Sequence, residues 1–482
     1  MAEVRKFLQC LGGKPVFLIL FLVCALPVTV LTALITPPGQ SPDEPSHMAR
    51  AAGLLHGEIL AHRITDIDPN TNLPQRETGV QADTGLGFAA FGNETQINGH
   101  PVMTAADLQM MLTTPPNHAL MFFGIPNTAT YFPLAYLPAT AGLAVAEAFG
   151  ARPYVCVPVA RMFMALSFVV LGLLTLYVAA YGEALLLTVL LMPMTLFLAG
   201  TLNQDGMLVA LTCLACALLT RGTRPTRWGA LAVFVCVLGS KQPYILLLGV
   251  FLEPLFTAGW VTRLKEVVIA ALPVVLWVVL IALFVVVPFG KPPYHPGPLY
   301  LGDRTITLDH TDTSANLHSL LAQPSRFITL PWHTNAMFGA YKLPEMIGQL
   351  GLLQIAMAPV VYVLWGVAIM CALLGVLLGG RRPGALVLRA RDGLFTLLLI
   401  FLTYWLLNLV FYLDWSNVGL DWIDGIQGRY LLPLLPFLLF ALPGLRLRVR
   451  LPAWVAALPT MGLGLFGIGY IPLLLVWTYY LH

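Results

Sequence analysis

Charged residues are scarce in this sequence, and their scarcity excludes an ordinary soluble fold. Asp, Glu, Lys and Arg make up 10% of the 482 residues, whereas 58% are hydrophobic. Soluble proteins carry about 25% charged residues. Apolar runs at 16–36, 266–288 and 453–480 each reach the ~20 residues that cross a bilayer. We therefore expect a single integral membrane domain over residues 1–482.

Two further absences narrow the range of functions. The net charge is only +3 and there is no basic block suited to nucleic acid, so we expect no nucleic-acid partner. The seven cysteines lie in or beside apolar segments, so they do not form the disulfide framework of a small secreted domain. Cys213 and Cys216 form a CxxC, but in an apolar run, where we interpret them as packing residues.

The distribution of Lys and Arg predicts the orientation, because these residues gather in cytoplasmic loops. The segment 37–130 has nine acidic and three basic residues, so we place it outside as the first outer loop, with 289–350 as the second. The N-terminus is then cytoplasmic, and the chemistry faces the periplasm or cell exterior. The clusters expected inside are Arg5/Lys6/Lys14, Arg221/Arg224/Arg227, Arg263/Lys265, Arg381/Arg382/Arg389/Arg391 and Arg446/Arg448/Arg450.

The parity of crossings between these loops predicts the number of membrane helices. A crossing at 131–150 would place the basic cluster at 221–227 outside, against its expected cytoplasmic position. The segment is also Pro-rich at its start, so we expect a re-entrant or interfacial helix there. The predicted fold class is an all-α integral membrane protein, a polytopic bundle of about 11 transmembrane helices with juxtamembrane helices on the outer face. The predicted crossings are 16–36, 155–178, 184–200, 207–220, 228–240, 243–258, 266–288, 353–378, 394–413, 429–445 and 453–480.

Two adjacent carboxylates open the first outer loop. Pro45 suits the first turn of a helix, and Asp43 or Glu44 suits its cap. One interpretation is a capping carboxylate on a surface helix. The other follows from the position just past a membrane helix, at the depth of a lipid-linked head group, where a carboxylate can act as general base. His47 and Arg50 would lie one turn apart on one face of this helix. Glu44 would orient His47 or Arg50, or help bind a metal.

Other polar residues are predicted on the same side of the membrane. Asp205 lies in a short polar link between apolar segments. Lys241 lies in another, followed by Tyr244, and is either a phosphate ligand or half of a structural ion pair. Arg161 lies early in an apolar run and needs an anionic partner, for which an outer carboxylate is suitable.

A last polar motif opens the next-to-last long helix. Arg429 and Tyr430 are either an interfacial anchor or an anion site, because a helix N-terminus favours anions. Gln427 belongs to the same motif. A group of metal-ligand types at Asp309, His310, Asp312 and His318 matches no specific site, so we interpret it as a polar loop.

Four separated motifs, PDEPSHMAR, NQD, SKQPY and QGRYLLP, together with Tyr131–Pro138, resemble the bacterial membrane-protein family catalogued as domain of unknown function 2142. That family is grouped with the GT-C glycosyltransferases. The resemblance implies a helical bundle with a catalytic carboxylate in its first outer loop, a polyprenyl-phosphate-sugar donor, and inversion at the anomeric carbon. By motif match the first-loop acid falls on Asp43, with Glu44 beside it, and the second-loop acid on Asp205. Metal dependence varies among relatives, so a divalent cation (Mg or Mn) stays open as cofactor.

These observations predict a glycosyltransferase of the bacterial inner (plasma) membrane with a glycan, lipid or protein acceptor. Asp43 and Glu44 are the catalytic candidates; Lys241 and Arg429 would stabilise the departing phosphate. One alternative is a transporter or flippase for lipid-linked saccharides, although carboxylates are missing from the helix centres. Another is a polymerase or ligase of lipid-linked oligosaccharides. The predicted substrate-binding residues are His47, Arg50, Arg161, Asp205, Lys241, Tyr244, Gln427, Arg429 and Tyr430.

Overall fold

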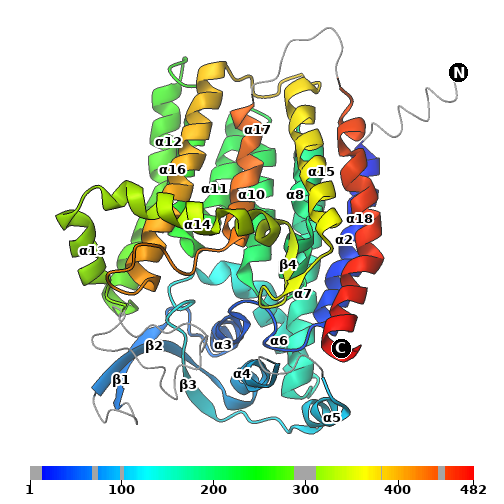
Figure 1. The fold of residues 1–482 in the computed structure, drawn as a ribbon, viewed down its shortest axis with the longest axis vertical. Coiled ribbons are helices and arrows are strands. Elements are labelled where there is room, and N and C mark those ends of the chain that lie inside the picture. The colour runs from blue at the N-terminus through cyan, green and yellow to red at the C-terminus, as the bar shows by residue number, and fades with distance from the viewer. Residues whose placement is uncertain are drawn as a thin grey trace, which may run out of the picture.

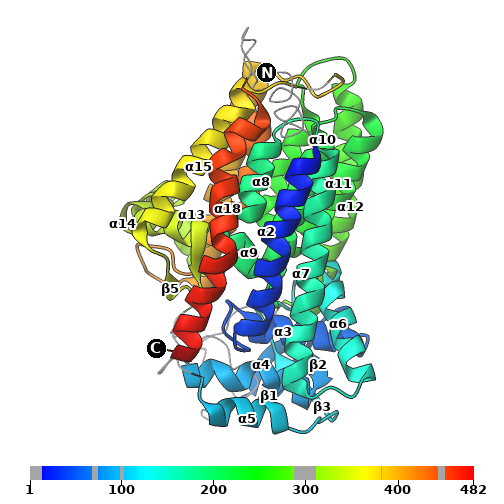
Figure 2. The same ribbon diagram turned by 90° about the vertical axis from the view of Figure 1, so that its right-hand side faces the viewer.

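The fold is a bundle of helices with a smaller loop-rich region at one end (Figure 1). Two long helices from opposite ends of the chain, α2 and α18, run side by side along one flank of the bundle (Figure 2). The computed structural model describes residues 14–67, 74–97, 103–286, 311–381, 383–442 and 451–481.

The bundle is built from apolar segments that match the predicted crossings in position. Proline at or near the first position begins several of them, as expected for a residue without an N–H to satisfy. The elements are α2 (Lys14–Ile35), α7 (Pro153–Val178), α8 (Glu183–Leu191), α9 (Pro193–Ala199), α10 (Gln204–Leu219), α11 (Arg224–Ser240), η2 (Gln242–Leu252), α12 (Trp260–Phe284), α15 (Pro359–Leu378), α16 (Ala390–Trp415), η3 (Gly428–Phe437), α17 (Leu438–Ala441), α18 (Ala453–Val476) and η4 (Trp477–Leu481).

Not all of these elements are long enough to cross a membrane alone. Among the described residues, 6 helices are long and apolar enough, or up to 7 if the bent pair α9 and α10 forms one span. The chain bends by 117° between these two helices. A multi-pass membrane protein is therefore supported, whereas about 11 crossings stays a prediction. The helix in 131–150, α6 (Leu137–Ala148), has 12 residues and spans roughly 18 Å, too short for a bilayer core.

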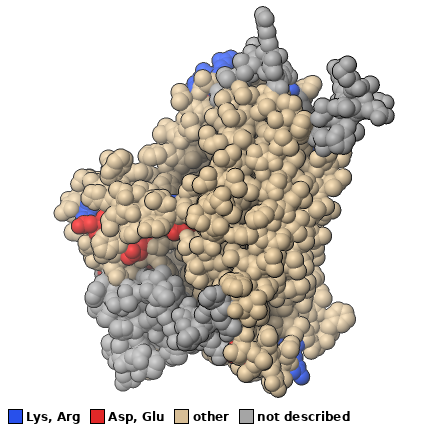
Figure 3. Space-filling model, turned by 45° about the vertical axis from the view of Figure 1, so that its right-hand side comes forward, with Lys and Arg blue, Asp and Glu red and all other residues tan. Residues whose placement is uncertain are grey.

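The described basic clusters lie together at one end of the bundle, the upper end in Figure 1. Arg224 and Arg227 both pair with Glu266 at the start of α12, and Arg391 donates to the carbonyl of Leu255. In Figure 3, Lys and Arg colour the upper end of the face and a broad uncharged band lies below it on the right, while further charged residues appear at the left and at the lower right. The structure thus separates the basic end from the loop-rich end; which of them faces the cytoplasm stays a prediction. The basic residues 5, 6, 382, 446, 448 and 450 lie outside the described residues.

The loop-rich end contains an element that the all-α prediction did not include, a three-stranded antiparallel sheet. Its order is β1-β2-β3, and Gly79 in the middle strand pairs with His62 on one side and Gly124 on the other. A Cβ at Gly79 would lie 1.9 Å from the carbonyl oxygen of Phe123, so only glycine fits this crossing. The elements here are α3 (Glu44–Leu55), β1 (His62–Ile67), β2 (Pro74–Asp83), α4 (Thr84–Ile97), α5 (Ala105–Thr113), β3 (Leu120–Gly124), η1 (Pro133–Tyr136) and α6.

The second outer segment adds helices that cross the bundle instead of running along it. In Figure 1, α14 (Arg326–Gly348) lies across the long helices, with α13 (Thr313–Ala322) at its side. The short pair β4 (Gln349–Leu350) and β5 (Ile355–Ala356) follows. Gly428, at the start of η3, packs against α14 so closely that a Cβ there would lie 2.2 Å from the Lys342 carbonyl oxygen. This contact fixes the beginning of η3, which carries Arg429.

Candidate functional site: a charged cluster beside a cavity

Asp43 ends the link between α2 and α3 in an uncommon backbone conformation. Its φ is 59°, in the left-handed region, and its side chain makes no capping bond to α3. Non-glycine residues rarely adopt this conformation, and in native structures it is concentrated at functional sites. The expected capping role of this carboxylate is therefore wrong. Its Oδ2 instead accepts a hydrogen bond of 2.7 Å from Arg429 Nη2.

Glu44, the neighbouring acid, lies in a different environment. Its carboxylate is fully buried and receives Arg161 Nε at 2.7 Å and Nη2 at 2.6 Å. The backbone N–H groups of Gly39 and Leu202 donate to it as well, each at 2.9 Å. Arg161 also donates to the carbonyls of Ala33, Thr36 and Pro37. The predicted partnership of Arg161 with an outer carboxylate is thus present, and the pair ties α2, α3 and α7 together.

His47 and Arg50 also lie buried in α3. The His47 ring nitrogen Nδ1 is 2.6 Å from the hydroxyl of Tyr136. Arg50 donates to the carbonyls of Glu58 and Ile59 at 2.6 and 2.7 Å. Neither residue bonds to Glu44, so the predicted orienting role of Glu44 is not what its contacts indicate. These three residues support the shape of the first outer loop.

Asp43 meets three other charged side chains from distant parts of the sequence. Arg429 Nη1 lies 3.5 Å from Asp205 Oδ2, and Lys241 Nζ lies 2.9 Å from Asp205 Oδ1. With the 2.7 Å pair between Arg429 and Asp43, the order is Asp43, Arg429, Asp205, Lys241. Two carboxylates and two cations balance, which is the condition for burying charges at low cost.

Tyr430 forms the floor beneath the two cations. Lys241 Nζ lies 4.0 Å and the Arg429 guanidinium carbon 5.1 Å from the ring centroid, both within cation–π range. The ring of Phe411 stacks on that of Tyr430, with the centroids 5.1 Å apart. The hydroxyl of Tyr244 donates to the Tyr430 carbonyl at 2.9 Å, so Tyr244 holds the backbone of this residue.

A cavity of about 580 Å³ opens beside this cluster. Its volume is within the range of small-molecule sites. Among the described residues, the buried polar atoms Ser240 Oγ, Gln427 Oε1 and Arg429 Nε have no hydrogen-bond partner. Buried polar groups are normally satisfied, so these atoms suit a ligand or water. The cavity is lined by the polar residues Asp43, Asn127, Lys241, Gln427 and Arg429 and the apolar Leu317, Leu407, Val410 and Phe411 among others.

The protonation of the site follows from burial and charge. Burial opposes ionisation of Asp43, but Arg429 and His47 outweigh it and lower the pKa of this carboxyl. Burial lowers the pKa of His47 to about 4, against the opposing effect of Asp43. At neutral pH, Asp43 is thus a carboxylate and His47 a neutral ring, available for the bond with Tyr136.

Several supporting residues carry no signal in the sequence. Asn127 donates to Asp43 Oδ1 at 3.4 Å, and Glu345 accepts the N–H of Gly428 at 2.6 Å. Both are far in sequence from the motifs that they support, and each is an ordinary polar residue in a loop or helix. Tyr131 and Tyr136 belong to the Tyr131–Pro138 motif, but the motif alone does not assign them to the site.

The charged cluster leaves little oxygen free for a metal. Asp43 and Asp205 already bond to Arg429 and Lys241, so a Mg or Mn ion there would displace these partners. Asp309 and His310 lie outside the described residues, and Asp312 caps α13 through Ser314 and Ala315. Among the described residues, the His, Cys, Asp and Glu side chains close enough to share an ion are Asp83, His118 and Glu147.

Comparison with known proteins identifies a family. The family model described as Predicted membrane protein (DUF2142) matches residues 26–438, which is most of the chain. The match spans all four motifs of the charged cluster. No curated protein and no solved structure matches the chain.

Proposed function

We propose a glycosyl-transfer function for this chain, which belongs to the DUF2142 family of predicted membrane proteins. In this proposal it moves a sugar from a polyprenyl-phosphate donor to an acceptor of the cell envelope, at the periplasmic or extracellular face of a bacterial membrane. The observation that carries the proposal is the partly exposed carboxylate of Asp43 (36% exposed), which borders a cavity together with Arg429 and Lys241.

Asp43 takes the role of general base. It accepts the proton of the acceptor hydroxyl while that oxygen forms a bond to the anomeric carbon. The bond between that carbon and the donor phosphate oxygen breaks, and its electron pair stays on the departing lipid phosphate. Attack from the face opposite the leaving group inverts the anomeric centre. Glu44 takes no part in these steps, because Arg161 and two backbone N–H groups already occupy it.

Lys241 and Arg429 act on the leaving group. Negative charge grows on the phosphate as the bond breaks, and preorganised cations in a site of low dielectric stabilise such charge strongly. Arg429 retains an unpartnered Nε in addition to its contacts with Asp43 and Asp205. A phosphate that draws Arg429 away from Asp43 also raises the basicity of Asp43, because Arg429 contributes most among the groups that lower the pKa of this carboxyl.

The two kinds of cavity wall fit the two parts of such a donor. Asp43, Lys241 and Arg429 suit a sugar phosphate, and the side chains of Leu407, Val410 and Phe411 on α16 suit the first part of an isoprenoid tail. Asp205 and Tyr244 do not line the cavity; they hold Lys241 and Tyr430 in position.

The test is transfer of radiolabelled sugar from a panel of polyprenyl-phosphate sugars by the purified protein. We expect transfer by the wild type, a loss of about 100-fold or more in Asp43→Asn, and a smaller loss in Lys241→Ala. The matched control is Asp107→Asn, a partly exposed aspartate of the same outer loop that completes the capping box of α5 with Thr104. If the wild type neither transfers nor binds any donor, the proposal fails. Donor binding without transfer, unchanged in Asp43→Asn, would favour a flippase.

A further inference from the structure

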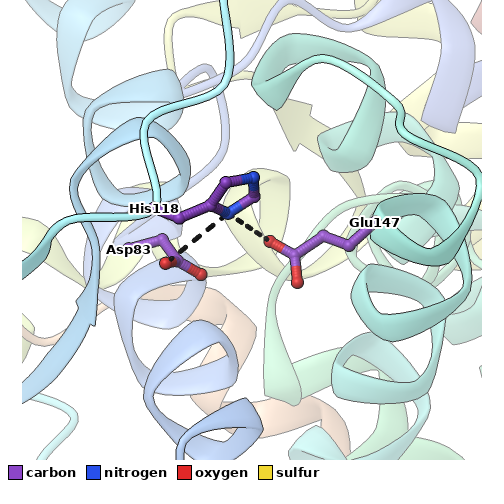
Figure 4. A group of neighbouring side chains, drawn as sticks. All are labelled: Asp83, His118 and Glu147. Carbon is purple, nitrogen blue, oxygen red and sulfur yellow. Dashed lines mark ion pairs between the residues drawn. The ribbon is translucent and has the colours of Figure 1, made fainter.

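A second cluster of titratable side chains lies in the loop-rich end (Figure 4). Asp83 ends β2, His118 precedes β3, and Glu147 lies near the end of α6. His118 Nδ1 is 3.8 Å from Asp83 Oδ1 and 3.9 Å from Glu147 Oε1. The candidate ligand atoms of the three residues all lie within 4.8 Å of one another.

The cluster has more negative charge than its own residues satisfy. The Asp83 side chain is 3% exposed, and its Oδ1 accepts no hydrogen bond within the described part of the chain. The Glu147 carboxyl faces it. The two carboxylates border one site and repel each other when both are charged. A cation between them would remove this repulsion.

The surrounding structure orients the cluster. His56 Nε2 lies 3.0 Å from Asp83 Oδ2, so the second oxygen of Asp83 is already engaged and Oδ1 points to His118. The N–H groups of Thr84 and Gly85 donate to the carbonyls of Ala119 and Asn117, each at 2.9 Å. These bonds hold the backbone on both sides of His118 against the start of α4.

We propose that Asp83, His118 and Glu147 bind a divalent transition-metal ion of the Zn²⁺ class. Asp83 Oδ1, His118 Nδ1 and Glu147 Oε1 are the ligands, and water takes the fourth position. Ligands about 2.1 Å from a tetrahedral ion lie about 3.4 Å apart. His118, whose side chain is 67% exposed, reaches this value on both sides with a shift of a few tenths of an ångström from 3.8 and 3.9 Å. The spacing between Asp83 and Glu147, at most 4.8 Å, closes through movement of Glu147, whose side chain is 25% exposed. His56 orients Asp83 from outside, as such partners do in metal sites.

The ligand types select the class of ion. A histidine among carboxylates suits Zn²⁺ and its neighbours, whereas Mg²⁺ and Ca²⁺ prefer oxygen alone. The site is separate from the cavity, because Asp43 and His56 lie at opposite ends of α3, which has 12 residues and is about 18 Å long. The ion would therefore fasten the sheet to α6, and the inference does not depend on the proposed transferase function.

Zn²⁺ binding to the full-length protein tests the proposal. The protein, purified on a histidine-free affinity tag and stripped with EDTA, is titrated calorimetrically with Zn²⁺, and with Mg²⁺ for comparison. We expect one Zn²⁺ per chain, binding at least about 100-fold weaker in His118→Ala and about 10-fold weaker in His56→Gln. Zn²⁺ should also raise the unfolding temperature of the wild type but not of His118→Ala. The matched control is His333→Ala, an exposed histidine on α14.

His118 is mostly exposed, so we expect His118→Ala to unfold at the wild-type temperature in EDTA. If it does not, Glu147→Gln, with a side chain 25% exposed, replaces it. The absence of Zn²⁺ binding by the wild type would overturn the proposal. So would equal Zn²⁺ affinity in the wild type and the ligand variant, which would indicate adventitious binding elsewhere on the surface.

Discussion

Replacing Arg161 by methionine should destabilise the protein more than any other single removal of a charge that we consider. The change leaves the buried carboxylate of Glu44 without a counter-ion, while the N–H groups of Gly39 and Leu202 still hold it in place. Three backbone carbonyls lose their donor as well. Breaking a buried pair from one side costs about 3–5 kcal/mol. We expect a loss in this range, measured by equilibrium unfolding in mixed micelles.

A double-mutant cycle separates the ion pair from other effects of the substitution. Glu44→Gln together with Arg161→Met removes both charges, so the double variant should be more stable than the sum of the single losses predicts. Arg224→Ala is the control, because its side chain is 69% exposed and Arg227 also pairs with Glu266; it should cost about 1 kcal/mol or less. A loss below 1 kcal/mol in Arg161→Met, or strict additivity in the cycle, would refute a structural role for the pair.

Three further changes test other parts of the site. Burial lowers the pKa of His47 to about 4 in the folded protein from its usual 6.5, so the unfolded chain binds more protons between these pH values. The free energy of unfolding should therefore fall as the pH drops from about 6.5 to about 4, by at most roughly 3 kcal/mol. His47→Gln should flatten this pH dependence in thermal unfolding. Gly428→Ala places a Cβ against the Lys342 carbonyl and should cost about 1–3 kcal/mol, whereas Gly366→Ala, inside α15 with open space around it, should keep or slightly raise the unfolding temperature. Arg429→Ala should lower sugar transfer by about 100-fold while unfolding stays cooperative; unchanged transfer would remove Arg429 from the mechanism.

The sequence predicted the bundle well because apolar length is a strong signal. The predicted crossings correspond to helices in the structure, and 131–150 contains the short helix α6. The three-stranded sheet was missed because β1 and β2 consist largely of polar residues and show little of the alternating apolar pattern that predicts a strand. The number of crossings does not follow from apolar length alone, because η2 and η3 are short apolar helices that length and composition do not classify as spans.

The sequence also predicted which motifs lie near one another, but not which role each of their residues takes. Asp43, Asp205, Lys241 and Arg429 were expected on one side of the membrane, and they form one cluster. Local sequence does not distinguish the two adjacent acids, because their difference depends on a left-handed residue at 43 and on a buried arginine 117 positions beyond Glu44.

The separation between the cavity and the Asp83 cluster changes how sensitivity to EDTA should be interpreted. At the cavity, Lys241 and Arg429 already supply the positive charge that a divalent ion supplies in other phosphate sites, so removing metal should not disable the proposed chemistry there. At the Asp83 cluster, removing the ion would loosen the region that carries α3 and Asp43. EDTA should therefore lower transfer mainly through stability, Zn²⁺ should restore it better than Mg²⁺, and His118→Ala should not respond to EDTA. Restoration of His118→Ala by Mg²⁺ would instead indicate a metal at the cavity itself.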